Sequence, residues 1–303
     1  MNAAAPSMTV SPPRRREAED WAARLPDLRT QALRVAATVA MGAHGRRQPG
    51  AGDSFWQFRP YHQGDSVRAI DWRRSARGDR NFIREREWEA AESFWFWVDQ
   101  SPSMHFSDGA DRPAKWDRAI VLALAIATLL LRSGERLGLL LSGGPLMLGT
   151  GMRALDRMVQ NLIDPQARTS LPPAMALPRH ATVLGFGDTW APLTDWDKQL
   201  GLLSGPGVRG QIVQVIDPVE ERFSLRGRVR LEGMEGEAPE LLRRAEDLSD
   251  AYAERFAGHC LGLETICQRR GWRYRRHATD QSPLPLLLAL YRAISLDRRS
   301  AHA

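Results

Sequence analysis

Cysteine and long apolar runs are scarce in this sequence, and their scarcity limits the classes of protein to which it can belong. The 303 residues contain two cysteines, Cys260 and Cys267. Their spacing in a helical pattern places them two turns apart, too far for a disulfide, so we expect buried thiols in a reducing compartment. No apolar segment of a signal peptide opens the chain. The longest apolar run, Ala119–Leu131, is shorter than the roughly 20 residues that span a bilayer. We therefore expect a cytoplasmic protein without a membrane span.

Lysine is also scarce, and almost all of the basic residues are arginine. The chain has 42 basic residues and a net charge of +6, yet its lysines are Lys115 and Lys198 alone. Two arginine clusters, at 14–16 and 269–276, lack the interleaved aromatic residues of a nucleic-acid-binding module. We expect these clusters to face solvent or an acidic protein rather than a nucleic acid.

Motifs of common enzymes are missing as well. The sequence contains no Gly-x-Ser-x-Gly elbow, no P-loop and no histidine pair at metal-binding spacing. A short glycine turn, Gly149-Thr150-Gly151, indicates the start of a helix more than a phosphate site. Nothing in these patterns predicts an enzyme.

What the chain does contain is organised around residues 94–103. Phe94–Val98 is a continuous apolar run, which is typical of a strand buried on both faces of a parallel sheet. It breaks into Asp99-x-Ser101-x-Ser103, and a long apolar helix follows. Strand, polar loop and helix open a doubly wound sheet, whose ligands bind at the carboxyl ends of the strands. These oxygen donors suit Mg²⁺ better than zinc, although a simple Asp/Ser turn would have the same sequence.

Strand and helix patterns alternate along the rest of the chain, which predicts a doubly wound, mostly parallel α/β sheet of the Rossmann type. We expect further strands at 136–142, 181–187, 212–216, 229–231 and 272–277, with pairing at 146–148, and helices at 21–41, 119–131, 152–163, 240–269 and 284–294. Composition divides the chain into a disordered tail (1–20), an N-terminal helix with a β-rich segment packed on the sheet domain (21–90), and the sheet domain itself (91–303).

The β-rich segment, whose residues 81–87 alternate like an edge strand, combines aromatic and charged residues at high density. Ion pairs within it would explain this, joining Arg59, Arg68 and Arg77 to Asp65, Asp71 and Glu85. A direct role in ligand binding is the alternative.

A second group of oxygen donors is expected near Asp99. The strand at 181–187 ends in Asp188, and Thr169 and Ser170 lie in the loop before that strand. Carboxyl ends of parallel strands share one edge of the sheet, so these groups can meet. Together they would form an open metal site with two carboxylates and three hydroxyls.

This set resembles the metal-ion-dependent adhesion site of von Willebrand factor A domains, in which an Asp-x-Ser-x-Ser loop, a later Thr and a further Asp bind Mg²⁺. The preceding segment is similar to the bacterial family called domain of unknown function 58. The matching residues are Tyr61, Gly64-Asp65, Arg68, Ile70-Asp71-Trp72, Ser75-Ala76-Arg77, Arg84-Glu85, and later Asp217-Pro218 with Glu220.

The resemblance implies a von Willebrand factor A-like fold and a Mg²⁺ (or Mn²⁺) site made of Asp99, Ser101, Ser103, Thr169 and Asp188. It also implies work beside a MoxR-type AAA+ ATPase in assembling or activating a client protein. Two departures from the family pattern stand out: Ala167-Arg168-Thr169 replaces the usual Gly-Gly-Thr, with Ser170 as the substitute donor, and Gly187 replaces the serine before Asp188.

Three functions follow from these observations. The first is a binding module in which the metal accepts a partner's carboxylate. The second is a phosphohydrolase or phosphotransferase with Asp99 as nucleophile, although Ser101 stands where such enzymes carry a second aspartate. The third is a scaffold whose site is degenerate.

Overall fold

The computed structural model divides the chain into two compact units. The described ranges are 12–44, 55–60, 72–75, 82–86, 92–109, 112–162, 170–223, 225–231 and 240–301. The smaller unit is His44–Ala91, and the larger joins Met1–Ala43 to Glu92–Ala303. The five metal ligands predicted from the sequence belong to the larger unit.

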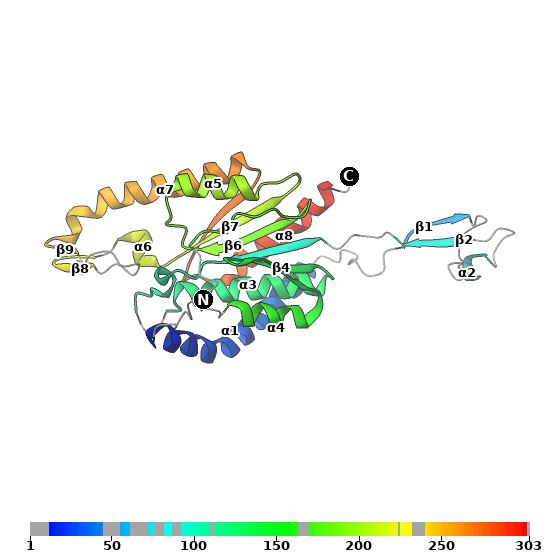
Figure 1. Ribbon diagram of the computed structural model, residues 1–303, viewed down its shortest axis with the longest axis horizontal. Helices are drawn as coiled ribbons and strands as arrows, with labels where there is room; N and C mark the ends of the chain where they lie inside the picture. The colour runs from blue at the N-terminus through cyan, green and yellow to red at the C-terminus, as the bar shows by residue number, and fades with distance from the viewer. Residues whose placement is uncertain are drawn as a thin grey trace, which may run out of the picture. The chain divides into compact units, whose positions relative to one another are not determined.

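The larger unit is built on a six-stranded sheet in the order β10-β7-β6-β3-β4-β5 (Figure 1). Its strands are β3 (Ser93–Val98), β4 (Arg136–Leu141), β5 (Gly144–Gly149), β6 (Thr182–Gly187), β7 (Arg209–Ile216) and β10 (Arg273–Ala278). Neighbouring strands are parallel except β4 and β5, which form an antiparallel pair. The predicted doubly wound, mostly parallel sheet is confirmed.

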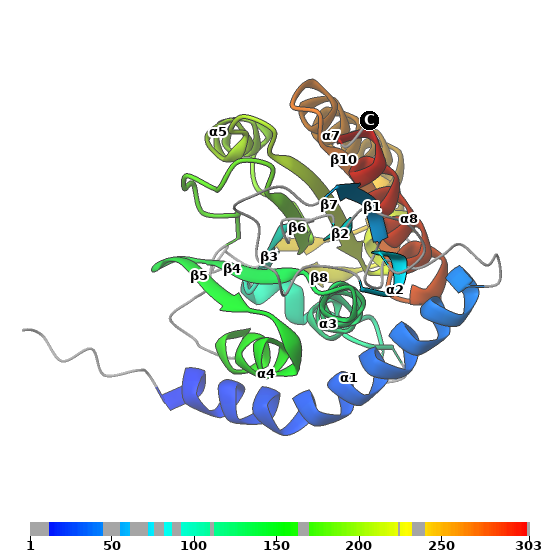
Figure 2. The ribbon, with the colours of Figure 1, turned by 90° about the vertical axis from the view of Figure 1, so that its right-hand side faces the viewer.

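Helices cover both faces of this sheet (Figure 2). One face carries α3 (Lys115–Arg132), α4 (Gly151–Leu162) and α8 (Pro283–Ala301), and the other carries α5 (Leu193–Leu203) and α7 (Ser249–Arg269). A doubly wound sheet needs both layers because its central strands are apolar on both sides. Helix α5 was not among the helices predicted from the sequence.

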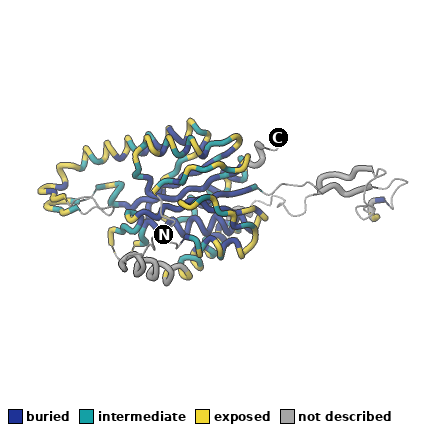
Figure 3. The backbone as a smooth tube through the Cα atoms, in the orientation of Figure 1, coloured by how far each residue is buried: buried dark blue, intermediate teal, exposed yellow. Residues whose placement is uncertain are grey.

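Strand β3 shows why both layers are needed. Phe94 and Phe96 pack into the core beneath α3, whereas Trp95 and Trp97 pack into the core beneath α5 and α7. All six of its residues are buried (Figure 3). The aromatic run therefore forms the centre of two hydrophobic cores, as its continuous apolar pattern predicted.

Helix α1 (Pro12–His44) differs from the predicted boundaries. It begins inside the segment for which a tail was predicted, and its Ala32, Ala36 and Val39 are buried in the same core as α3. Arg24 of α1 also pairs with the buried Asp117 of α3. These contacts group the helix with the sheet rather than with the β-rich segment that follows it in the sequence.

The helix predicted over 240–269 is wrong in its first part. Residues Glu240–Leu242 form strand β9, which pairs antiparallel with β8 (Val229–Leu231), and a 3-10 turn, η4 (Ala245–Leu248), leads into α7. Helical periodicity continues through this stretch, but Leu242 is buried as a strand residue paired with Val229. Tertiary pairing overrides the local helical pattern here.

The smaller unit contains an antiparallel pair of strands, β1 (Phe55–Pro60) and β2 (Phe82–Arg86), and a short helix, α2 (Trp72–Ser75). The extended pattern predicted around residue 84 is confirmed by β2. The ion pairs predicted in this segment lie outside the described residues, and its packing on the sheet domain stays a prediction.

Both cysteines are buried and unpaired, as predicted. Burial raises the pKa of Cys267 to about 12, which makes its thiol unreactive. Within the described ranges, no helix combines the length and apolarity that crossing a membrane requires.

His277 of β10 gives the fold a predicted sensitivity to acid. Its ring is 2% exposed, and its Nε2 atom has no hydrogen-bond partner in the described part of the chain. Burial and then Arg118 lower the pKa of His277 from 6.5 to about 4, although Asp280 opposes this. The unfolded chain therefore takes up a proton as the pH falls below about 6.5, while the folded protein does so near 4.

We expect the stability contributed by this neutral histidine to be present above pH 6.5 and lost as the pH falls toward 4. At pH 5 the loss is about 2 kcal/mol. Urea unfolding at pH 7 and pH 5 measures it, and His277→Gln should show a smaller difference between the two pH values. The exposed His180, changed to Asn, serves as control; equal pH dependence in the wild type and the His277 variant would contradict the prediction.

Candidate metal centre at the carboxyl edge of the sheet

Asp99 follows β3 and is fully buried. Its backbone N–H donates to the carbonyl of Phe186 at 2.8 Å, which carries the sheet pairing one residue past the strand. Oδ1 of its side chain accepts from the N–H of Ser101 at 2.8 Å. Oδ2 is buried without a hydrogen-bond partner among the described residues. The turn interpretation thus accounts for one carboxylate oxygen and leaves the other free for a ligand.

Three further oxygen donors lie in a chain beside Asp99. Ser101 precedes the 3-10 turn η2 (Pro102–His105), and its Oγ lies 3.0 Å from Oγ of Ser103 within that turn. Ser103 in turn donates to Oδ2 of Asp188 at 2.6 Å. The structure therefore brings together four of the five residues predicted from the sequence, from the ends of β3 and β6.

The fifth predicted residue, Thr169, lies outside the described residues. Its neighbour Ser170, named as the substitute donor, lines the pocket that contains Ser103 and Asp188. Ser170 thus reaches the predicted edge of the sheet.

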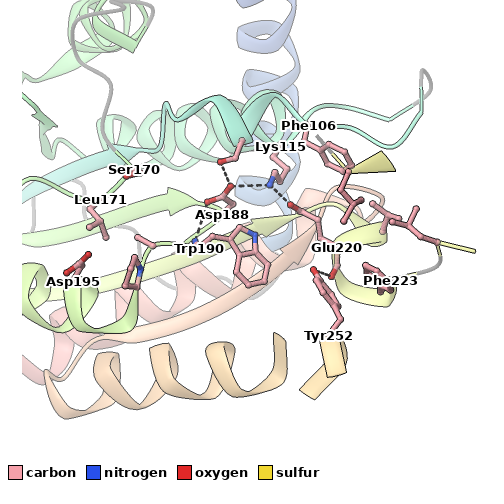
Figure 4. A pocket seen from close by; sticks show the side chains of 16 residues that line it. Phe106, Lys115, Ser170, Leu171, Asp188, Trp190, Asp195, Glu220, Phe223 and Tyr252 are labelled. Carbon is pink, nitrogen blue, oxygen red and sulfur yellow. Dashed lines mark hydrogen bonds and ion pairs between the residues drawn. The ribbon is translucent and has the colours of Figure 1, made fainter. Parts of the chain in front are cut away.

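Lys115, the first residue of α3, is the part of the site that the sequence analysis missed. Its Nζ lies 3.1 Å from Oδ2 of Asp188 and 2.5 Å from Oε1 of Glu220, and the side chain is 1% exposed (Figure 4). Burial opposes the charge on Lys115, but Asp188 and Glu220 outweigh burial and raise its pKa. A signal was available: Lys115 is one of two lysines in an arginine-rich chain, and it stands within one helical turn of the apolar run Ala119–Leu131.

Asp217, which follows β7, has a structural role in this arrangement. It caps α6 (Pro218–Arg222) by accepting from the N–H of Val219 at 3.0 Å, while Glu220 accepts from the N–H of Asp217 at 2.8 Å. Oδ2 of Asp217 also accepts from the N–H of Asp108 at 3.1 Å. This reciprocal cap holds Glu220 in place to meet Lys115.

A pocket of about 610 Å³ lies over Asp188, Lys115 and Glu220. Its polar floor contains Ser103, Lys115, Asp188 and Glu220, and its walls are largely apolar. The wall residues include Phe106, Leu171, Trp190, Pro192, Val219, Phe223, Leu225, Leu231 and Tyr252. Figure 4 shows Trp190 beside the chain of Asp188, Lys115 and Glu220, with Tyr252 and Phe223 farther along the pocket.

The donor set fits Mg²⁺ by its chemistry. No cluster of three His, Cys, Asp or Glu side chains in the described ranges has metal-binding geometry, so a metal here must draw on the serine hydroxyls and on water, as Mg²⁺ does. Burial and then the neighbouring Asp188 raise the pKa of Asp99 to about 8. Asp99 is therefore largely protonated at neutral pH without a metal, and a divalent cation could displace that proton at Oδ2, which has no hydrogen-bond partner among the described residues.

Comparison with protein families gives one match that covers most of the chain. The model described as "Protein of unknown function DUF58" matches residues 57–260, a range that includes all five predicted metal ligands.

Individual proteins match over shorter lengths or at lower similarity. Uncharacterized proteins from Mycobacterium bovis and Mycobacterium tuberculosis are 35% identical over 109 residues, which is 36% of this chain. The chain spans about a third of the length of these relatives, 34%.

Among solved structures, the conserved hypothetical protein BatB from Bacteroides thetaiotaomicron is 14% identical, with 69% of this chain and 100% of that chain covered and a TM-score of 0.37. An aerotolerance-related membrane protein from Bacteroides fragilis is 13% identical, with 68% and 99% covered and a TM-score of 0.37.

Proposed function

The chain belongs to the DUF58 family, whose function is unknown, and on this premise we propose that it is a metal-dependent protein-interaction module. Mg²⁺ (or Mn²⁺) would be held by Asp99, Ser101, Ser103 and Asp188, with Thr169 or Ser170 as a further donor. The observation that carries the proposal is the buried Oδ2 of Asp99, which has no hydrogen-bond partner in the described part of the chain and lies beside the chain of Ser101, Ser103 and Asp188.

The bound ion would supply a Lewis-acidic position at the floor of the pocket. Two carboxylates and two neutral hydroxyls leave Mg²⁺ short of its six oxygen ligands. A carboxylate that arrives from outside is a favourable ligand, because it brings the negative charge that the hydroxyls lack. The pocket opens above Ser103 and Asp188, so such a group has a route to the ion.

The partner in this proposal comes from the family resemblance. A MoxR-type AAA+ ATPase, acting with this chain on a client protein, would supply the carboxylate or control its release. We prefer the ATPase to the client as the source of the carboxylate. A pull-down with the purified ATPase should retain it in Mg²⁺ and lose it in EDTA or with Asp188→Ala.

The geometry gives less support to a phosphohydrolase. Ser101 occupies the position two residues after Asp99, where a general acid would stand, and its hydroxyl is engaged with Ser103 at 3.0 Å. Lys115, a possible phosphate ligand, is already paired with Asp188 and Glu220. Hydrolysis of p-nitrophenyl phosphate that is lost in Asp99→Asn would favour the enzyme instead.

The metal itself is the first test. We expect Asp99→Ala to abolish Mg²⁺ and Mn²⁺ binding in calorimetric titration and to leave the fold intact, since the side chain lies at the edge of the sheet and its loss removes one capping bond, to Ser101. Circular dichroism checks the fold. Asp195→Ala, which removes a carboxylate from the opposite side of the pocket, is the matched control. Equal Mg²⁺ affinity in Asp99→Ala and the wild type would refute the site.

A further inference from the structure

The pocket above the candidate metal centre continues along a wall of aromatic side chains from α7 and its neighbours. The rings of Phe223 and Tyr252 are stacked with centroids 4.7 Å apart, and Tyr252 and Phe256 stack at 6.3 Å. The ring centroids of Trp190 and Phe256 lie 5.6 Å apart. This wall borders the same floor that holds Asp188 and Glu220. A ligand atom on the metal would therefore have apolar surface directly beside it.

The aromatic wall is held rigidly. The hydroxyl of Tyr252 donates to the backbone carbonyl of Glu220 at 2.7 Å, which fixes the ring over α6. His259 of α7 bonds through its ring to the carbonyl of Thr189 at 2.8 Å and lies against Trp190 at 5.2 Å. Because these rings are already ordered, a ligand that packs on them loses little entropy to reorganisation of the pocket.

Backbone strain is concentrated around this pocket. In the described ranges three non-glycine residues have positive φ, and two of them flank the pocket: Thr189 at 62° and Phe223 at 39°. The left-handed conformation of Thr189 turns the backbone between Asp188 and Trp190. The same conformation at Phe223 accompanies the stacking of its ring on the ring of Tyr252. Such conformations are strained for residues with a side chain and are concentrated at binding and active sites.

We propose that this pocket receives a partner segment in which one acidic residue is adjacent to a large aromatic or aliphatic residue. The inference rests on the proposed function, because the acidic side chain would complete the metal shell. The apolar neighbour would fill the space between Trp190, Val219 and Tyr252. A volume of about 610 Å³ exceeds that of a single carboxylate and falls in the range of about 300–1,000 Å³ typical of ligand sites.

The charges in the pocket further restrict which partner segments can bind. Asp195 and Glu220 add carboxylates to the lining, whereas the cation of Lys115 is buried and already paired. A second acidic residue in the partner would meet these carboxylates without a free cation among the described lining residues to balance it. The pocket thus selects a single carboxylate beside an apolar side chain and disfavours an acidic run.

Three short peptides test the motif by calorimetry with the full chain in Mg²⁺: acetyl-Asp-Phe-amide, acetyl-Asp-Ala-amide and acetyl-Asp-Asp-amide. We expect the Phe peptide to bind about tenfold or more tightly than the Ala peptide, since burying a large apolar side chain exceeds the 1.4 kcal/mol of a tenfold change. The Asp-Asp peptide should bind no better than the Ala peptide. Phenylacetate serves as a small-molecule probe.

Variants of the wall separate this inference from the proposed function. Val219→Trp, or Leu231→Trp if the first variant fails to fold, should fill the pocket and abolish the preference for the Phe peptide while Mg²⁺ affinity is retained. Leu261→Trp, at an exposed site on α7, is the matched control and should change neither. Equal binding of the Phe and Ala peptides with normal Mg²⁺ binding would overturn the inference alone.

Two other outcomes have distinct meanings. If the wild-type protein does not bind Mg²⁺, the proposed function and the inference are both overturned. Phenylacetate that binds as tightly as the Phe peptide would assign the pocket to a small aromatic acid and overturn the partner motif.

Discussion

The Lys115→Met variant is expected to be less stable than the wild type in EDTA and to bind Mg²⁺ more tightly. Lys115 is the cation between Asp188 and Glu220, and its side chain is 1% exposed. Its removal leaves two buried carboxylates without a counter-ion, a change that costs about 3–5 kcal/mol when one partner of a buried pair is lost. For a unit of this size the melting temperature should fall by roughly 10 °C.

Magnesium should reverse much of this loss. In the wild type, an ion at the site shares Asp188 with the ammonium group and is repelled by it. Without the ammonium, the extra negative charge should raise Mg²⁺ affinity about tenfold or more. Melting curves in EDTA and in Mg²⁺, with calorimetric titration of Mg²⁺, measure both effects.

The chain offers a matched control for this variant. Lys198 is the other lysine and is exposed on α5, so Lys198→Met should change neither property. The double variant Lys115→Met/Glu220→Gln removes both partners of the 2.5 Å pair and should recover part of the lost stability. A single variant with unchanged melting temperature and unchanged Mg²⁺ affinity would show that Lys115 does not set the charge of the site.

The Gly187→Ala variant is expected to weaken metal binding through a steric effect alone. A Cβ at this position would lie 2.7 Å from Cβ of Asp99, 2.9 Å from its Oδ2 and 2.8 Å from Cη2 of Trp97. Both neighbours are buried, so the Asp99 carboxylate must shift or the strands must separate. Overpacking of this kind costs about 1–3 kcal/mol.

We expect Mg²⁺ affinity in Gly187→Ala to fall at least about tenfold, because small displacements of a ligand group disrupt octahedral coordination. Calorimetry measures the affinity, and urea unfolding measures the stability. Gly143→Ala is the control, since a Cβ there meets no atom within 4 Å. Normal Mg²⁺ affinity in a folded Gly187→Ala protein would place the metal away from Asp99.

This glycine also explains a departure from the family pattern. The family pattern has a serine before the aspartate, where this chain has Gly187, and the structure shows that the side chain of Asp99 occupies the space that a serine side chain would need. The absence of a Cβ allows β3 and β6 to bring Asp99 and Asp188 to the same edge. The close approach of Gly187 to the side chain of Asp99 depends on the spacing between β3 and β6, so local sequence patterns carried no sign of it.

The strand, loop and helix around Asp99 were determined by the sequence, because a short aromatic run such as Phe94–Val98, followed closely by Pro102, favours a strand buried on both faces. The convergence of Asp99 with Asp188 followed from the same logic, since parallel strands share a carboxyl edge. Chain order and apolar periodicity are local properties, and they sufficed to predict the doubly wound sheet.

Tertiary structure alone decided how charge is balanced at that edge. Lys115, Asp188 and Glu220 lie on α3, the end of β6 and α6, and each would be a solvated side chain if its element stood alone. Their pairing arises because the packing of α3 beneath the sheet excludes water from the lysine, so its charge requires carboxylates within reach. Periodicity predicts which face of an element is buried, whereas the partners of a buried charge depend on the distances between elements distant in sequence.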